Sequence, residues 1–139
     1  MEGPHGEIYD ILRIDGQTTT AYNKAAITQL NLSTGALTFV KMIDFPSCPS
    51  KFVIRRDPTT KLYYTLSTDV TPQAVEINTV FARNHLIMAM SADLETWKFC
   101  DTLLTDDTGF PPADSAQYTG FHYVDWQFDN NDIVFAART

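Results

Sequence analysis

The sequence predicts an all-β protein built from antiparallel strands. Short runs rich in Ile, Val, Tyr, Phe and Thr recur along the 139 residues, and turn signals separate them. Helical periodicity is scarce. A hydrophobic fraction of 44% and a charged fraction of 19% are typical of a globular chain, and the length suffices for one domain with a modest core.

We expect nine strands, at residues 7–15, 24–32, 36–45, 51–57, 61–68, 84–91, 96–104, 120–128 and 131–138. Their connections carry residues that favour tight turns, among them Ser33-Thr34-Gly35, Asp57-Pro58-Thr59-Thr60 and Asp129-Asn130-Asn131. Two longer loops, about 69–82 and 105–119, hold Pro and Gly residues. The pattern indicates an antiparallel meander.

The strand pattern repeats along the chain. The segments GEIYDILRI from Gly6, TKLYYTLST from Thr60 and NDIVFAART from Asn131 align without gaps. Two longer segments, beginning at Asn23 and Asn84, also align. The spacings are 54 residues (6 to 60) and 61 residues (23 to 84), and four-stranded β-propeller blades have periods of roughly 40 to 60 residues. A β-sandwich with accidental similarity is the alternative.

Under the propeller interpretation the chain is one partial domain, an incomplete β-propeller arc of antiparallel four-stranded blades. Residues 1–45 form most of one blade, 51–104 a complete blade and 120–139 the first half of a third. An open arc leaves strand edges unpaired, so a homo-oligomer that closes these edges is one expected assembly.

Charge and hydropathy argue against two kinds of partner. The net charge is −7 and the Lys and Arg residues are scattered, whereas a nucleic-acid surface needs a clustered basic face. No apolar run approaches the roughly 20 residues of a membrane span. The N-terminus also lacks the basic and apolar regions of a signal peptide. Neither nucleic acid nor membrane is therefore expected, and the location is left open.

The residues that usually bind metals or cofactors are isolated from one another. Cys48 and Cys100 lie far apart without CxxC spacing, which leaves one disulfide and two separate thiols both open. The chain has no GxSxG, HExxH or P-loop motif. No metal and no cofactor is expected, because the three histidines are equally dispersed, at His5, His85 and His122.

The segment SADLETW, residues 91–97, resembles the Asp-box, the Ser-x-Asp-x-x-x-Trp turn of bacterial neuraminidase (BNR) repeats. Together with the segments that start at Lys51, Arg83 and Gly120, it resembles sialidase-type and related glycoside hydrolase propellers. The resemblance covers most of the chain and implies about two to two and a half blades of a larger, often secreted or periplasmic, enzyme. It also implies a structural role for Asp93 in the turn and for Trp97 between blades.

The family resemblance implies an arginine cluster that binds a substrate carboxylate. Arg13 and Arg138 occupy the same place in the aligned repeat, and strand alternation puts both opposite the apolar residues of their strands. Guanidinium groups from separate blades can bind a carboxylate in bidentate fashion. The alternative is that each Arg pairs with a nearby acid such as Asp15. Further candidate substrate-binding residues open other strands: Arg83, Asn84 and Lys51.

Three residues are candidates for catalysis. Tyr123 and Asp125 are two apart and share one strand face, while Val124, Trp126 and Phe128 share the other. The resemblance implies a Tyr nucleophile polarised by a carboxylate and an Asp that acts as acid and base. Glu2 is the candidate for a second carboxylate. The alternative is that the Tyr and Asp are bonded to the next blade, and a core role is favoured for Trp97 and Trp126.

The expected function is that of a partial sialidase-like glycoside hydrolase, which hydrolyses a terminal sugar of a glycan and is inactive as an isolated monomer. The expected partner is a carbohydrate. A non-catalytic carbohydrate-binding or protein-interaction propeller module is the alternative, because fold alone does not establish function.

Overall fold

A computed structural model describes residues 1–15, 22–47, 49–76 and 81–139. These residues form nine strands and two short helices: β1 (Tyr9–Arg13), β2 (Lys24–Leu30), β3 (Leu37–Asp44), β4 (Val53–Arg56), β5 (Tyr63–Thr68), α1 (Pro72–Glu76), β6 (His85–Ser91), β7 (Trp97–Thr105), α2 (Pro112–Tyr118), β8 (His122–Asp129) and β9 (Asp132–Arg138). All nine predicted strands are confirmed, with ends that differ by at most two residues.

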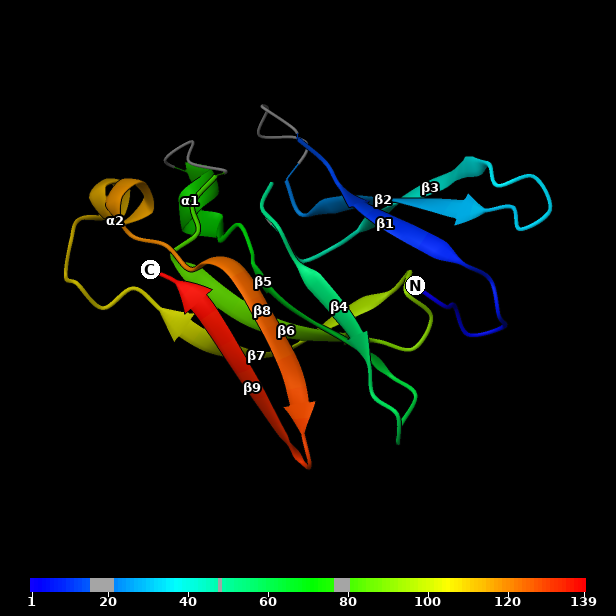
Figure 1. The fold of residues 1–139 in the computed structure, drawn as a ribbon. Coiled ribbons are helices and arrows are strands. Elements are labelled where there is room, and N and C mark those ends of the chain that lie inside the picture. The colour runs from blue at the N-terminus through cyan, green and yellow to red at the C-terminus, as the bar shows by residue number, and fades with distance from the viewer. Residues whose placement is uncertain (16–21, 48, 77–80) are drawn as a thin grey trace.

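The strands form three antiparallel sheets, none of which closes on itself within the described residues (Figure 1). The first sheet has the order β1-β2-β3, the middle sheet β4-β5-β6-β7, and the third is the β8-β9 hairpin. Every pairing joins strands that follow one another in the chain. The predicted antiparallel all-β meander is therefore confirmed.

The middle sheet is packed on both faces. On one face, Ile54 of β4 and Trp97 of β7 contact a cluster of the first sheet that contains Ile27 and Phe45. On the other face, a second cluster joins this sheet to the hairpin through Leu66, Leu86, Val124 and Trp126. Trp126 is 2% exposed, which confirms its core role. The sheets thus stack in chain order, and each fully buried large apolar side chain contributes about 1.5–3 kcal/mol.

The faces of β1 and β9 differ in which residues they bury. In β9 the predicted alternation is confirmed, since Ile133 and Ala137 pack in the core while Arg138 lies on the other face. In β1 the packed residues are Tyr9 and Ile11, and Leu12 is 43% exposed. Arg13 lies opposite Leu12, as predicted, but the face that it shares with Tyr9 and Ile11 is the packed one, contrary to the expectation that Ile8 and Leu12 form the apolar face. The first sheet meets the middle sheet through this face, and one strand's sequence does not encode which neighbour it meets.

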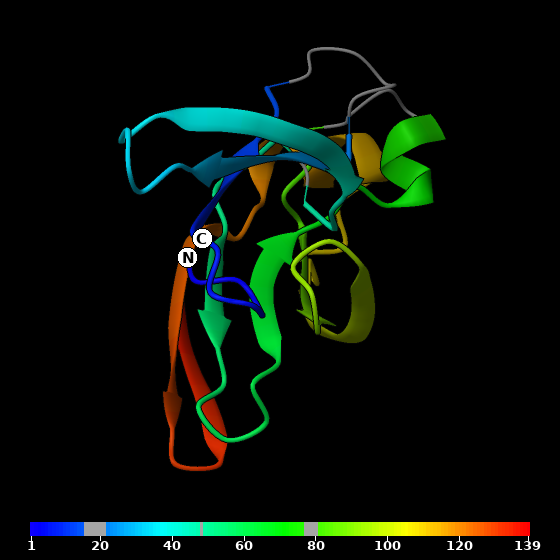
Figure 2. The same ribbon diagram turned by 90° about the vertical axis from the view of Figure 1, so that its right-hand side faces the viewer.

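Two helices within the long loops were not predicted. α1 and α2 lie together at one end of the sheets (Figures 1 and 2), where Val70, Ala74 and Ala82 form a small core. Before α1, the Thr71 hydroxyl accepts a hydrogen bond from the Ala74 N–H at 3.2 Å, and Pro72 occupies the first helical position. In the described part of the chain, no helix has the length and apolar character needed to span a membrane.

The turn between β6 and β7 is held by its own polar groups. Asp93 Oδ1 accepts hydrogen bonds from the Ser91 hydroxyl at 2.9 Å and from the N–H groups of Glu95 at 2.9 Å and Thr96 at 2.7 Å. Burial acts to raise the pKa of Asp93, but the hydrogen bonds from Thr96 and Glu95 outweigh it and the pKa lies below its ordinary value. Leu94, with φ of 68°, is fully buried under this turn.

Candidate anion-binding site

A pocket of about 210 Å³ lies where the three sheets meet, and it is lined by Arg13, Ser50, Lys51, Arg83, His122, Tyr123 and Arg138. We call it the cationic pocket. Its side chains come from β1, β8 and β9 and from the segments that precede β4 and β6. Four of the ten Lys and Arg residues of the chain gather here, although they are scattered in the sequence.

The cations of this pocket have no acidic partner among the described residues. The ion pairs found there lie elsewhere: Lys24–Asp44, Lys41–Glu95, Arg55–Asp125 and His85–Asp69. The alternative pairing of Arg13 with Asp15 does not occur in that set, and the pocket lining contains no Asp or Glu. Like charges held together favour an anion between them, because it replaces mutual repulsion with attraction. The arrangement is therefore suited to binding an anion.

Tyr123 brings two of these cations together. Lys51 Nζ lies 4.7 Å from the centroid of the Tyr123 ring, and Arg138 Cζ lies 4.6 Å from it. Tyr123 has a φ of 52°, and the register between β8 and β9 shifts between His122 and Asp125. This irregularity re-aims the side chain, as β-bulges near binding sites commonly do.

His122 belongs to the pocket, although it was not among the predicted site residues. Burial lowers the pKa of His122, and the nearby Arg83 and Arg138 lower it further. A neutral imidazole at pH 7 offers one donor and one acceptor to a ligand. Ser50, the other residue that was not predicted, has its hydroxyl 2.9 Å from the Thr68 hydroxyl. The position of His122 next to Tyr123 was a usable signal, whereas nothing in the sequence pointed to Ser50.

Asp125 lies beside the pocket but is held by another partner. Its Oδ1 accepts hydrogen bonds from Arg55 Nη2 at 3.0 Å and from the Trp126 N–H at 2.9 Å. As predicted, Tyr123 and Asp125 are both exposed while Val124 and Trp126 are buried. We define the apolar groove as the neighbouring cavity of about 390 Å³ lined by Ile11, Leu12, Arg13, Lys51, Phe52, Val53, Tyr123, Val124 and Asp125.

Glu2 is not brought to the cationic pocket. It forms an antiparallel bridge with Ile8, and its carbonyl accepts a hydrogen bond from the Tyr63 hydroxyl at 2.9 Å. Tyr63 begins β5 and Ile8 precedes β1, whereas Arg13 ends β1. Glu2 therefore lies at the opposite end of these strands from the pocket.

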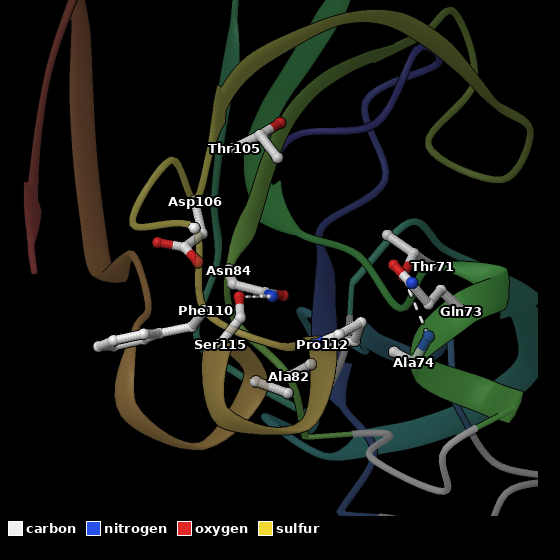
Figure 3. A pocket seen from close by; sticks show the side chains of 12 residues that line it. Thr71, Gln73, Ala74, Ala82, Asn84, Thr105, Asp106, Phe110, Pro112 and Ser115 are labelled. Atoms are coloured by element: carbon white, nitrogen blue, oxygen red, sulfur yellow. Dashed lines mark hydrogen bonds between the residues drawn. The ribbon is translucent and has the colours of Figure 1, made fainter.

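Asn84 faces a different cavity from its neighbour Arg83. Figure 3 shows this cavity of about 210 Å³ beside the helices, where Asn84 Nδ2 donates to Ser115 Oγ at 2.6 Å. Asp106 also lines it, and hydrogen bonds from the side chains of Ser115 and Thr108 lower the pKa of this carboxyl. Alternation along the chain explains why adjacent residues point to different cavities.

Among the described residues, no cysteine and no group of metal-ligating side chains lies at the cationic pocket. Within the described residues, no three His, Cys, Asp or Glu side chains come together as metal ligands would. The choice between one disulfide and two thiols involves Cys48, which lies outside the described residues. Cys100 is a half-buried residue of β7, and burial and the neighbouring Asp101 raise the pKa of its thiol.

Comparisons with known proteins found no matching family model, no similar curated protein and no similar solved structure. The site has to be interpreted from its own geometry.

Proposed function

We propose that the cationic pocket binds the carboxylate of an acidic sugar, and that the chain is the substrate-recognition part of a sialidase-like glycoside hydrolase. The observation that carries this proposal is the convergence of Arg13, Lys51, Arg83 and Arg138 without an acidic partner among the described residues. Guanidinium groups recognise carboxylates in planar, bidentate pairs. In a chain with a net charge of −7, this concentration of positive charge is a local exception.

Two features of the fold support a β-propeller arc as the scaffold of this site. Three sheets stack in chain order, and the middle one has the four antiparallel strands of a blade. The turn of residues 91–97 makes the hydrogen bonds expected of an Asp-box, with Asp93 as acceptor. Trp97 packs against Phe45 of the first sheet, with ring centroids 5.0 Å apart.

A non-catalytic carbohydrate-binding module is the second candidate, and the placement of the acids favours it for the isolated chain. Tyr123 needs a carboxylate beside it to act as a nucleophile. Among the described residues, Asp125 pairs with Arg55 and Glu2 lies at the far end of β5. We therefore expect the 139-residue chain to bind an acidic sugar without hydrolysing its glycosides.

Calorimetric titration with N-acetylneuraminic acid and with its methyl ester tests the binding. The two ligands share the sugar ring and differ in the carboxylate charge. We expect the acid to bind at least about tenfold more tightly, since hydrogen bonds to charged groups contribute roughly 1.5–3 kcal/mol. Arg83→Ala and Arg138→Ala should each remove most of this difference. Lys98→Ala, at an exposed cation of β7, is the matched control and should leave it unchanged.

Equal affinity of the acid and the ester, or equal affinity of the Arg138→Ala and wild-type proteins for the acid, would refute the proposal. A fluorogenic sialoside separates the two candidates. Hydrolysis that disappears in Tyr123→Phe and in Asp125→Asn while binding persists identifies an enzyme. Binding with no measurable hydrolysis by the wild type identifies a binding module.

A further inference from the structure

We propose that Asp69, His85 and Thr102 form a nucleophilic triad, in which the Thr102 hydroxyl attacks a small carboxylic ester and becomes acylated. The three side chains are linked in a row. His85 Nδ1 lies 2.5 Å from Asp69 Oδ1, and His85 Nε2 lies 3.2 Å from Thr102 Oγ1. A hydroxyl within reach of a base that a third group orients is the arrangement that activates a nucleophile. The inference is independent of anion binding at the cationic pocket.

Three neighbouring strands supply these side chains. Asp69 follows the last residue of β5, His85 begins β6 and Thr102 belongs to β7. β6 lies between β5 and β7 in the middle sheet, so the ring of His85 has one partner on each side. Continuing the antiparallel register of β5 and β6 by one position beyond its last pair puts Asp69 opposite His85.

A β-bulge in β7 lies beside Thr102. Leu86 pairs with Leu104, and the next residue of β6 pairs with Thr102. Leu103 is therefore an extra residue on β7. A bulge bends its strand and re-aims side chains, and bulges are frequent next to active sites. Thr102 is exposed, so an ester can reach its hydroxyl from solvent.

The carboxylate of Asp69 selects which nitrogen of His85 carries the proton. A carboxylate only accepts hydrogen bonds, so the tautomer with the proton on Nδ1 satisfies this contact and leaves a lone pair on Nε2. Of the four ion pairs found among the described residues, this one is the least exposed, with side chains 22% and 23% exposed. Water therefore competes weakly with the contact that orients the ring.

The lone pair of His85 faces the proton that has to leave when Thr102 reacts. Nε2 accepts the hydrogen of the Thr102 hydroxyl in this tautomer. The other acid next to this hydroxyl, Asp101, accepts the backbone N–H of Thr102 at 2.8 Å through its Oδ1. The imidazole is thus the group placed to act as the base.

The proposed step is an acyl transfer that conserves all atoms. Thr102 Oγ1 forms a bond to the carbonyl carbon of the ester, and its proton moves to His85 Nε2. The bond from this carbon to the alkoxy oxygen breaks, and the imidazolium returns the proton to the departing alcohol. A water molecule activated in the same way hydrolyses the acyl-threonine to the carboxylic acid and regenerates the hydroxyl.

Incubation of the full chain with p-nitrophenyl acetate, followed by peptide mapping with mass spectrometry, tests the proposal. We expect Thr102 to be acetylated at least about 100-fold faster than Thr38, because a positioned base contributes roughly 10²–10⁴-fold. Thr38 is the matched internal control, since it is also an exposed strand threonine and no histidine is hydrogen-bonded to it in the described part of the chain. Equal rates at the two threonines overturn the proposal.

Two variants test the base and its orientation separately. His85→Gln removes the base and should lower acetylation of Thr102 to the rate of Thr38. In wild type this rate should rise from about pH 5 to about pH 8, the range in which histidine loses its proton. Asp69→Asn places an amide donor at Nδ1 and leaves the proton on Nε2, so the rate should fall at least about tenfold and lose its rise with pH.

Unchanged acetylation of Thr102 in His85→Gln, or an unchanged pH profile in Asp69→Asn, also overturns the assignment. The pH profile distinguishes orientation of the imidazole from a merely structural role of Asp69. If either variant fails to fold, the comparison of Thr102 with Thr38 in the wild-type chain still decides the outcome.

Discussion

The turn between β6 and β7 and the cationic pocket are both clusters of polar groups, but they differ in whether their partners are internal. In the turn, Asp93 is surrounded by donors from Ser91, Glu95 and Thr96. In the pocket, four cations converge, and among the described residues no acid lines the pocket or pairs with them. A satisfied cluster stabilises the fold, whereas an unsatisfied cluster indicates a ligand. The difference supports the proposal that the pocket binds a ligand.

The largest expected effect concerns the turn between β6 and β7, whose polar groups have internal partners. Asp93→Ala leaves the hydroxyl of Ser91 and two backbone N–H groups without their acceptor. We expect the free energy of unfolding to fall by about 2–3 kcal/mol, since a hydrogen bond to a charged group contributes roughly 1.5–3 kcal/mol and two of these three bonds are half-buried. Urea denaturation measures this loss. Asp107→Ala, at an exposed acid, is the control and should stay within about 0.5 kcal/mol of wild type.

A smaller effect concerns the pH dependence of the pocket. The pKa of His122 is lower in the folded than in the unfolded chain, so the unfolded chain binds more protons as pH falls below about 6.5. Its contribution to stability is therefore present above pH 6.5 and is lost as pH falls through the folded pKa. Urea denaturation at pH 7.5 and 5.5 should show a smaller loss in His122→Gln than in wild type. An equal loss of the free energy of unfolding in both proteins would contradict a contribution of His122 to the pH dependence.

The smallest expected effect concerns the exposed ion pair beside the pocket. Arg55 and Asp125 are 3.0 Å apart, with side chains 42% and 73% exposed. Solvent screens such a pair, so Asp125→Ala should cost less than about 1 kcal/mol of folding free energy. A loss of folding free energy as large as that of Asp93→Ala would mean that this exposed pair beside the pocket stabilises the fold as much as the turn does. Thermal and urea denaturation under the same buffer conditions provide this comparison.

Local sequence signals predicted the strands because period-two alternation and turn residues act over a few positions. The helices were missed because Pro and Gly residues suggested loops, although Thr71-Pro72 is a helix-start signal. The buried face of β1 could not be predicted from its own sequence. It depends on which neighbouring sheet Ile11 meets, which is a property of the tertiary packing.

The sequence predicted those pocket residues that lie near the ends of strands which meet in the fold. Arg13 and Arg138 share a place in the repeat, and the fold brings both to one pocket. Asn84 was misplaced because the backbone turns it away from Arg83. His122 was missed because the irregularity at Tyr123 changes the direction of side chains in β8. The distortion itself leaves no mark in the sequence, so the neighbouring Tyr123 was the one signal that pointed to His122.

The position of the cationic pocket means that the proposed ligand would help to hold the sheets together. Its lining comes from β1, from β8 and β9 and from the segments that lead into β4 and β6, so the proposed ligand would contact parts of the chain next to all three sheets. The β8-β9 hairpin packs mainly through the face that carries Val124 and Trp126. Opening of this hairpin would carry Tyr123 and Arg138 away and release the ligand. By linkage, the proposed ligand at 100 times its Kd would oppose this opening by about 2.7 kcal/mol.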